Sequence, residues 1–128
     1  MAISFTTRVE GDLLNVEAAG HVETLAEIQG YSLAVIEAAR NGRCTRVLCD
    51  ERELVGSLRT LDAYEAAKFI ADQAPSVGRA AVVCDEAFLG DRKFWETVAV
   101  NRGVALRAFA DIDKARAWLY EEQRSVPA

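Results

Sequence analysis

The sequence is poor in the residues that stabilise small secreted proteins and structural metal sites. Its 128 residues include three cysteines, Cys44, Cys49 and Cys84. Because the number is odd and no Cys-x-x-Cys pair occurs, neither a disulfide framework nor a zinc knuckle is expected, and we predict reduced structural thiols. With only two prolines, eight glycines and 51% hydrophobic residues, the chain is typical of a globular protein.

Long apolar runs and basic clusters are also missing. No window approaches the ~18 consecutive apolar residues of a membrane span, and no basic leader precedes an apolar stretch in the first residues. The formal net charge of -5 at pH 7 repels phosphate backbones and anionic lipids at long range. We therefore expect a cytoplasmic protein that neither binds nucleic acid nor spans a membrane.

The sequence lacks the motifs of the commonest enzyme sites. It has one histidine, His21, and no motif places a serine or cysteine beside it. There is no Gly-x-Gly-x-x-Gly and no Gly-Lys-Ser/Thr run, so no nucleotide-binding loop is indicated. The absence of an assembled catalytic set favours a non-catalytic protein without a cofactor.

Hydrophobic periodicity predicts alternating strands and helices. Residues 3–9 and 13–18 alternate between apolar and polar, as half-buried strands do, and Gly11-Asp12 between them fits a hairpin turn. From Thr24 the spacing becomes helical, Thr24-x-x-Glu27 matches a capping box, and Gly30 inside this helix indicates either close packing or a bend. Further strands are predicted at 46–50, 80–84 and 104–109. Three more helices are expected, with inner faces Ala63/Ala66/Ala67/Ile70/Ala74, Phe94/Trp95/Val98 and Ile112/Ala115/Leu119.

This order, ββαβαβαβα, predicts an α/β fold with a mixed five-stranded sheet and four helices. Helical crossovers make the last four strands parallel, and the hairpin makes the first strand antiparallel. No linker or low-complexity stretch divides the chain, so we expect one domain over residues 1–128, with a frayed tail at 124–128.

The sharpest internal feature is a near-repeat of Val-Leu-Cys-Asp-Glu and Val-Val-Cys-Asp-Glu, each at the end of a predicted strand. The two repeats place Asp50, Glu51, Asp85 and Glu86 at one edge of the sheet. Ligands of open α/β sheets bind at that edge, and paired carboxylates there can hold Mg²⁺ or act as acid and base. The same residues are also typical of solvated loops and of helix starts, so both interpretations stay open. Glu51-Arg52-Glu53 does not give the Asp-x-Asp pattern of haloacid dehalogenases.

Aromatic residues suggest a second kind of site. Tyr64 and Phe69 project to either side of the alanine face of their helix, where a subunit interface, a pocket mouth or a neighbouring element would cover them. A cavity lined by Tyr64, Phe69 or Trp95 would suit an apolar ligand or a lipid.

Three stretches, 45–52, 78–83 and 108–119, together resemble the SpoIIAA-like branch of the STAS (anti-sigma-factor antagonist) superfamily. The last of them, with Phe109, Asp111, Asp113 and Trp118-Leu119, is the most recognisable. The resemblance covers nearly the whole chain. It implies a STAS-type fold and a small binding or regulatory module.

In the partner-switching members of that superfamily, an Asp-Ser pair at a helix start carries the regulatory phosphate. Asp62 matches this aspartate, but Ala63 and Tyr64 replace the phosphoacceptor. Ser57 and Thr60 lie in the same loop, and the helix dipole would stabilise a phosphate there, although Thr60 also fits an ordinary helix cap.

We thus expect a non-catalytic STAS-type module that binds a protein partner or itself. The alternatives are a Mg²⁺-assisted enzyme using the acidic rim and an apolar-ligand carrier. If all helices cover one face of the sheet, as the family fold implies, Leu48, Ala80 and Val82 or their neighbours leave apolar area exposed, which a homodimer would cover.

Overall fold

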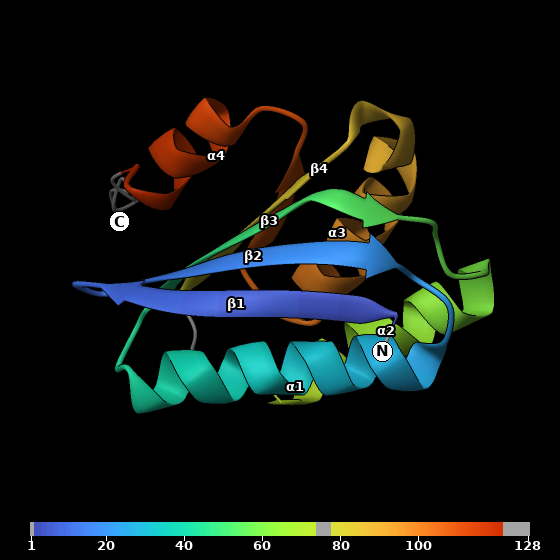
Figure 1. Ribbon diagram of the computed structural model, residues 1–128, viewed down its shortest axis with the longest axis horizontal. Helices are drawn as coiled ribbons and strands as arrows, with labels where there is room; N and C mark the ends of the chain where they lie inside the picture. Colours follow the sequence, from blue (N-terminus) through green and yellow to red (C-terminus); the bar gives the residue numbers. More distant parts are fainter. Residues whose placement is uncertain (1, 74–77, 122–128) are drawn as a thin grey trace, which may run out of the picture.

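A hairpin followed by three crossover units builds the protein around one twisted sheet (Figure 1). The computed structural model describes residues 2–73 and 78–121. The strands are β1 (Ile3–Glu10), β2 (Leu13–His21), β3 (Arg46–Val55), β4 (Arg79–Cys84) and β5 (Leu106–Phe109). The helices are α1 (Leu25–Asn41), α2 (Thr60–Gln73), α3 (Leu89–Asn101) and α4 (Ile112–Leu119), with a short 3₁₀ turn, η1 (Glu86–Phe88), before α3.

The five strands follow one another in the order β1-β2-β3-β4-β5. β1 pairs antiparallel with β2, and every later neighbour is parallel, so the predicted fold is confirmed. The carboxyl ends of β2, β3, β4 and β5 therefore meet at one edge of the sheet. Gly11, with φ of +60°, forms the hairpin turn as the sequence predicts.

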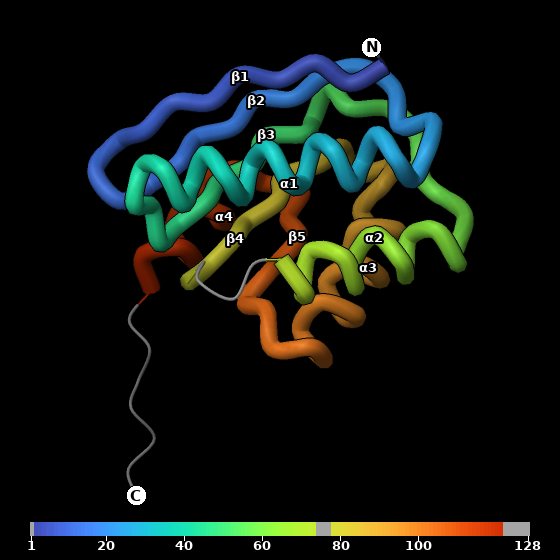
Figure 2. Tube along the Cα trace, turned by 90° about the horizontal axis from the view of Figure 1, so that it is seen from below, coloured from blue at the N-terminus to red at the C-terminus, as the bar shows by residue number. Residues whose placement is uncertain are grey.

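Helices cover both faces of the sheet, and not one face as the resemblance implied. Figure 2 shows α1, α2 and α3 in front of the sheet with α4 behind it. On the face of α1 to α3, the core includes Leu14, Val16, Val47 and Leu54. On the other face, Ala115 and Leu119 of α4 pack against Leu13, Leu48, Ala81 and Val83.

This arrangement corrects the argument for a dimer. Leu48, which was expected to lie exposed, is 2% exposed beneath α4, while Ala80 and Val82 face the opposite layer. The strands that α4 does not cover carry polar side chains on that face, among them Arg8, Glu17 and Arg52. No apolar sheet face is therefore left among the described residues to require a second copy, and the homodimer stays a prediction.

Local signals at the helix ends behave as predicted, with some corrections. The hydroxyl of Thr24 accepts a hydrogen bond of 3.2 Å from the backbone N–H of Glu27, and Asp111 caps α4. Phe94, expected to point inward, is 38% exposed. Trp95 takes the inner position of α3, and its neighbour Phe94 lies 100° around the helix from it. Ala74 and the tail at 124–128 lie outside the described residues.

Candidate functional site

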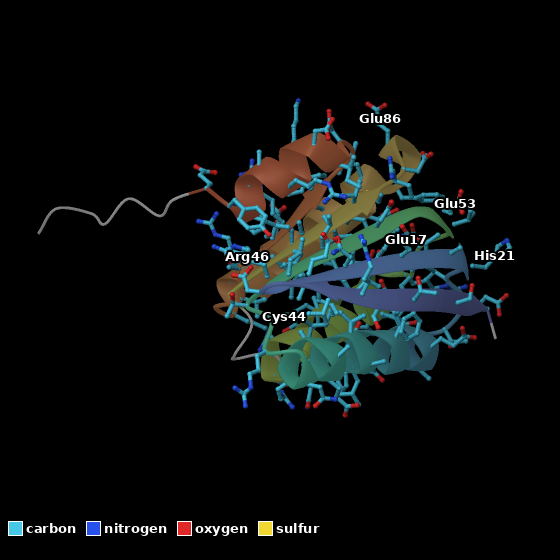
Figure 3. The ribbon with its side chains drawn as sticks, turned by 60° about the vertical axis from the view of Figure 1, so that its left-hand side comes forward. Glu17, His21, Cys44, Arg46, Glu53 and Glu86 are labelled. Carbon is cyan, nitrogen blue, oxygen red and sulfur yellow. The ribbon has the colours of Figure 1, made fainter. Side chains whose placement is uncertain are left out.

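The strand predicted to end at residue 50 continues to Val55, so Asp50 and Glu51 lie within β3, and they do not converge with Asp85 and Glu86 after β4. Asp50 lies on the α4 side and forms a 2.7 Å ion pair with Arg52. Asp85 accepts a 2.8 Å hydrogen bond from the backbone N–H of Ala87 and so caps η1. Glu86 is exposed, and Figure 3 shows its carboxylate directed away from the sheet.

Glu51 differs from the other three because it is buried, with 5% of its surface exposed. Among the described residues no group of three His, Cys, Asp or Glu side chains is placed to hold a metal ion. The acidic-rim enzyme with Mg²⁺ stays a prediction that the positions of these four residues do not favour.

Strand alternation places Glu51 on the buried face, and a β-bulge directly after it changes the register of the rest of β3. Glu17 pairs with Asp50, but Ala19 pairs with Glu53, so β3 carries one extra residue beside β2 at Glu51 and Arg52. Val47, Cys49 and Glu51 follow the two-residue alternation onto the face of α1 to α3. The extra residue then returns Leu54, which is 1% exposed, to this same face.

The carboxylate of Glu51 is held by a tyrosine on α1. The hydroxyl of Tyr31 donates a 2.8 Å hydrogen bond to Oε2 of Glu51, and Tyr31 is itself 7% exposed. The ring of Phe5 packs edge-on against the Tyr31 ring with 5.1 Å between centroids, which fixes the tyrosine between the sheet and the helix.

Burial dominates the protonation behaviour of this cluster. It raises the pKa of Glu51, against the opposing effects of the Arg92 charge and the Tyr31 hydrogen bond. It also raises the pKa of Tyr31, further assisted by the nearby Cys49 and Glu51. The Cys49 thiol has its pKa raised far above the usual range, mainly by burial, so it is not an activated nucleophile.

Two small cavities meet at this cluster, between the sheet and the three helices. The smaller, of ≈ 40 Å³, reaches toward Leu58 and Arg92, and the larger, of ≈ 60 Å³, reaches toward Ile70 and Leu106. Tyr31, Glu51 and Trp95 line both of them. The larger cavity is otherwise mostly aliphatic, so the site combines one buried carboxylate with an apolar wall.

The aromatic prediction holds only in part. Trp95 lines both cavities, but Tyr64 and Phe69 are not among their lining residues. Tyr64 instead accepts a 2.7 Å hydrogen bond from Nη2 of Arg102, whose guanidinium lies 5.6 Å from the ring centroid. The residue that follows α3 therefore contacts Tyr64, and Phe69 is half-buried.

The segment 56–59 between β3 and α2 is tied to the start of α3. The hydroxyl of Ser57 donates a 2.7 Å hydrogen bond to Oδ2 of Asp91, and the guanidinium of Arg92 donates to the carbonyl of Gly56 at 3.3 Å. Thr60 is the exposed first residue of α2, and Asp62 lies in its first turn. Ser57 thus lies in the segment before α2, while Thr60, which was expected in the same loop, and Asp62 lie in the helix itself.

Two apolar side chains are exposed on either side of this segment. Leu61 is 72% exposed, and Val55 is 48% exposed. Neither exposed side chain was predicted from the sequence, nor was the burial of Glu51. The alternation of Val47, Cys49 and Glu51 carried a signal for the last of these, because it places the carboxylate on the buried face.

His21 lies at the end of β2 and is exposed (Figure 3). None of the helices over residues 2–73 and 78–121 is long and apolar enough to cross a bilayer.

Comparisons with known proteins agree with this architecture. The model of the family described as SpoIIAA-like matches residues 13–120. The fold is similar to that of an anti-sigma factor antagonist from Mycobacterium paratuberculosis, with a TM-score of 0.60 and 13% identity, covering 93% of this chain and 95% of the other.

It is also similar to an uncharacterised DUF3478-family protein with a SpoIIAA-like fold from Shewanella loihica PV-4. The TM-score of this comparison is 0.57 and the sequence identity is 21%, and the alignment covers 92% of this chain and 94% of the other. Among curated proteins, none matches the sequence.

Proposed function

Because the chain belongs to the SpoIIAA-like family, we propose that it is a non-catalytic regulatory module that binds a protein partner. The observation that carries this proposal is the exposure of Leu61, at 72%, in the first turn of α2. Covering a large apolar side chain with a partner favours binding, because full burial of such a side chain is worth roughly 1.5–3 kcal/mol. Val55, at the other end of segment 56–59, adds a second such side chain.

The segment between these two residues supports binding because it is already ordered. Ser57 and Gly56 are both hydrogen-bonded to α3. A loop that is fixed before association loses less conformational entropy when the partner arrives. We call Val55, segment 56–59 and Leu61 the loop surface. One structural neighbour is an anti-sigma factor antagonist, so an anti-sigma factor is the first partner class to test.

The test compares two surface substitutions of the same kind. Leu61→Glu places a charge on the loop surface, and the matched control Val100→Glu places one on α3, where Val100 is 52% exposed. Candidate anti-sigma factors encoded near this protein are purified, and binding is measured by calorimetry. The proposal expects the wild type and Val100→Glu to bind alike and Leu61→Glu to bind at least tenfold more weakly. Equal binding by both variants, or no binding by the wild type, would overturn it.

Phosphate control of this surface through Ser57 or Thr60 is a separate hypothesis. A phosphate on Ser57 would replace a hydrogen bond to Asp91 with repulsion between two anions, and so release segment 56–59 from α3. Incubation with a cognate serine kinase followed by mass spectrometry tests it. An unmodified Ser57 and Thr60 would end this hypothesis while leaving the loop surface itself untouched.

We also propose a cytoplasmic location, which the three free and buried cysteines support because thiols stay reduced in that compartment. Self-association remains an open prediction, which sedimentation at high concentration would test.

A further inference from the structure

We propose that the larger cavity binds a small apolar primary amine, whose ammonium group donates a hydrogen bond to Oε1 of Glu51. This ligand site goes beyond the proposed partner binding, and it is formed by different residues from the loop surface. It rests on three features: a buried carboxylate with a free oxygen, aromatic rings beside it, and an apolar cavity of limited size.

The first feature is the hydrogen-bonding state of Glu51. Oε2 accepts from Tyr31, and the described residues provide no donor for Oε1. Among these residues, every side-chain oxygen that is completely buried has a hydrogen-bond partner. Oε1 is therefore not fully enclosed, and Glu51 lines both cavities. A buried carboxylate oxygen gains most from a charged donor.

The second feature is the charge and aromatic character of the wall. Among the described residues, Glu51 is the one charged side chain that lines the larger cavity. Arg92 lines only the smaller cavity, where its guanidinium is engaged with the carbonyl of Gly56. The rings of Tyr31 and Trp95 also line the larger cavity, and aromatic faces attract organic cations. A carboxylate ligand such as a fatty acid would meet the like charge of Glu51 instead.

The third feature is the volume, which limits the ligand. At ≈ 60 Å³ the cavity is smaller than the roughly 150 Å³ cavity in which an engineered protein holds benzene. Val35, Val82 and Leu106 close it with aliphatic side chains. A branched amine of about five non-hydrogen atoms suits this space, and a ligand of that size is expected to bind in the millimolar range.

The experiment uses three probes of matched shape: isobutylammonium, isobutanol and isobutyrate. Each is titrated into the full chain at constant ionic strength, and amide shifts of the cavity-lining residues are followed by ¹H–¹⁵N NMR. We expect isobutylammonium to bind about tenfold more tightly than isobutanol, and isobutyrate not to bind. Equal binding of the amine and the alcohol, tighter binding of isobutyrate, or no shift with any probe would overturn the proposal.

Two variants and a matched control locate the site. Glu51→Gln keeps the size and an acceptor for Tyr31 but removes the charge, so the tenfold preference for the amine should disappear. Glu53→Gln removes the same charge from an exposed position of the same strand and should leave the preference unchanged. Ala80→Leu fills the cavity without altering any charge, and should abolish binding of both probes.

The outcomes also separate this site from general electrostatic attraction. If Glu53→Gln weakens amine binding as much as Glu51→Gln does, the amine responds to net charge and the cavity site is refuted. If Glu51→Gln does not fold, Ala80→Leu alone decides: unchanged amine binding in that variant refutes the site.

Discussion

The hydroxyl of Tyr31 on α1 donates a 2.8 Å hydrogen bond to the carboxylate of Glu51 at the bulge of β3. The two residues are twenty positions apart in the chain, and both are buried. This contact joins the first helix to the centre of the sheet through polar groups inside an otherwise apolar layer. Its consequences for stability can be measured directly.

Replacing Tyr31 by Phe removes the described hydrogen-bond donor of the Glu51 carboxylate while keeping the aromatic ring. We expect the free energy of unfolding to fall by about 1–3 kcal/mol, because a buried acceptor is left without its partner. Urea denaturation at pH 7 measures the change. The same substitution should lower the free energy of unfolding by less in the background of Glu51→Gln, because a neutral side chain is less costly to leave unpaired. Equal losses in both backgrounds would contradict the coupling between Tyr31 and Glu51.

The raised pKa of Glu51 predicts a pH dependence of stability. Its folded pKa lies above the ordinary value of 4.5, so the folded chain holds the proton more tightly than the unfolded chain. The stability contributed by this group is fully present below the ordinary pKa of 4.5, and it is lost as the pH rises through the folded pKa. Glu51→Gln removes this loss, so its stability relative to the wild type should increase from pH 4.5 toward pH 7. Urea denaturation across this range measures the difference.

Asp50 provides a control of opposite sign, because its hydrogen bonds from Arg52 lower the pKa of its carboxyl. The stability it contributes is present above its ordinary value of 3.8 and is lost as the pH falls through the folded pKa. The difference between Asp50→Asn and the wild type should therefore stay nearly constant from pH 4.5 to 7. A parallel pH trend in both variants would show that Glu51 is not the source.

Two glycines predict opposite effects of the same substitution. Gly20 has φ of +118°, and a Cβ there would lie 1.9 Å from the carbonyl oxygen of Ala2. Gly20→Ala should therefore destabilise the protein by about 2 kcal/mol or more. Gly30 is exposed in α1 with no atom within 4 Å of its added Cβ, so Gly30→Ala should stabilise by about 1 kcal/mol. Urea midpoints compare them, and a loss of stability in Gly30→Ala would contradict this account.

Leu119 tests how strongly α4 is held to its face of the sheet. It is 1% exposed and packs with Leu48 and Val83, so Leu119→Ala should cost about 2–5 kcal/mol. Leu61→Ala removes the same atoms at a position that is 72% exposed, and its effect should stay within about 0.5 kcal/mol. Thermal or urea unfolding of both variants checks this contrast. A small effect of Leu119→Ala would mean that α4 contributes little to the core.

Part of the candidate site could be read from the sequence and part could not. The repeated Cys-Asp-Glu stretches marked the end of β4 correctly, but β3 continues to Val55, so Asp50 and Glu51 lie within that strand and not at its end. These stretches could not show that Tyr31 would hold the carboxylate of Glu51 or that Asp85 is used as a cap. Nor could periodicity show that Trp95 lines a cavity while Tyr64 is taken by Arg102.

The order of strands and helices, the parallel arrangement, the hairpin turn and the caps at Thr24 and Asp111 follow from the sequence alone. They depend on local periodicity and on contacts between near neighbours, which the sequence contains directly. The covering of both sheet faces, the bulge at Glu51 and the cavity around its carboxylate were decided only by the tertiary structure. They depend on how segments far apart in the chain pack together, and residues such as Tyr31 and Glu51 meet only when the helix has docked on the sheet.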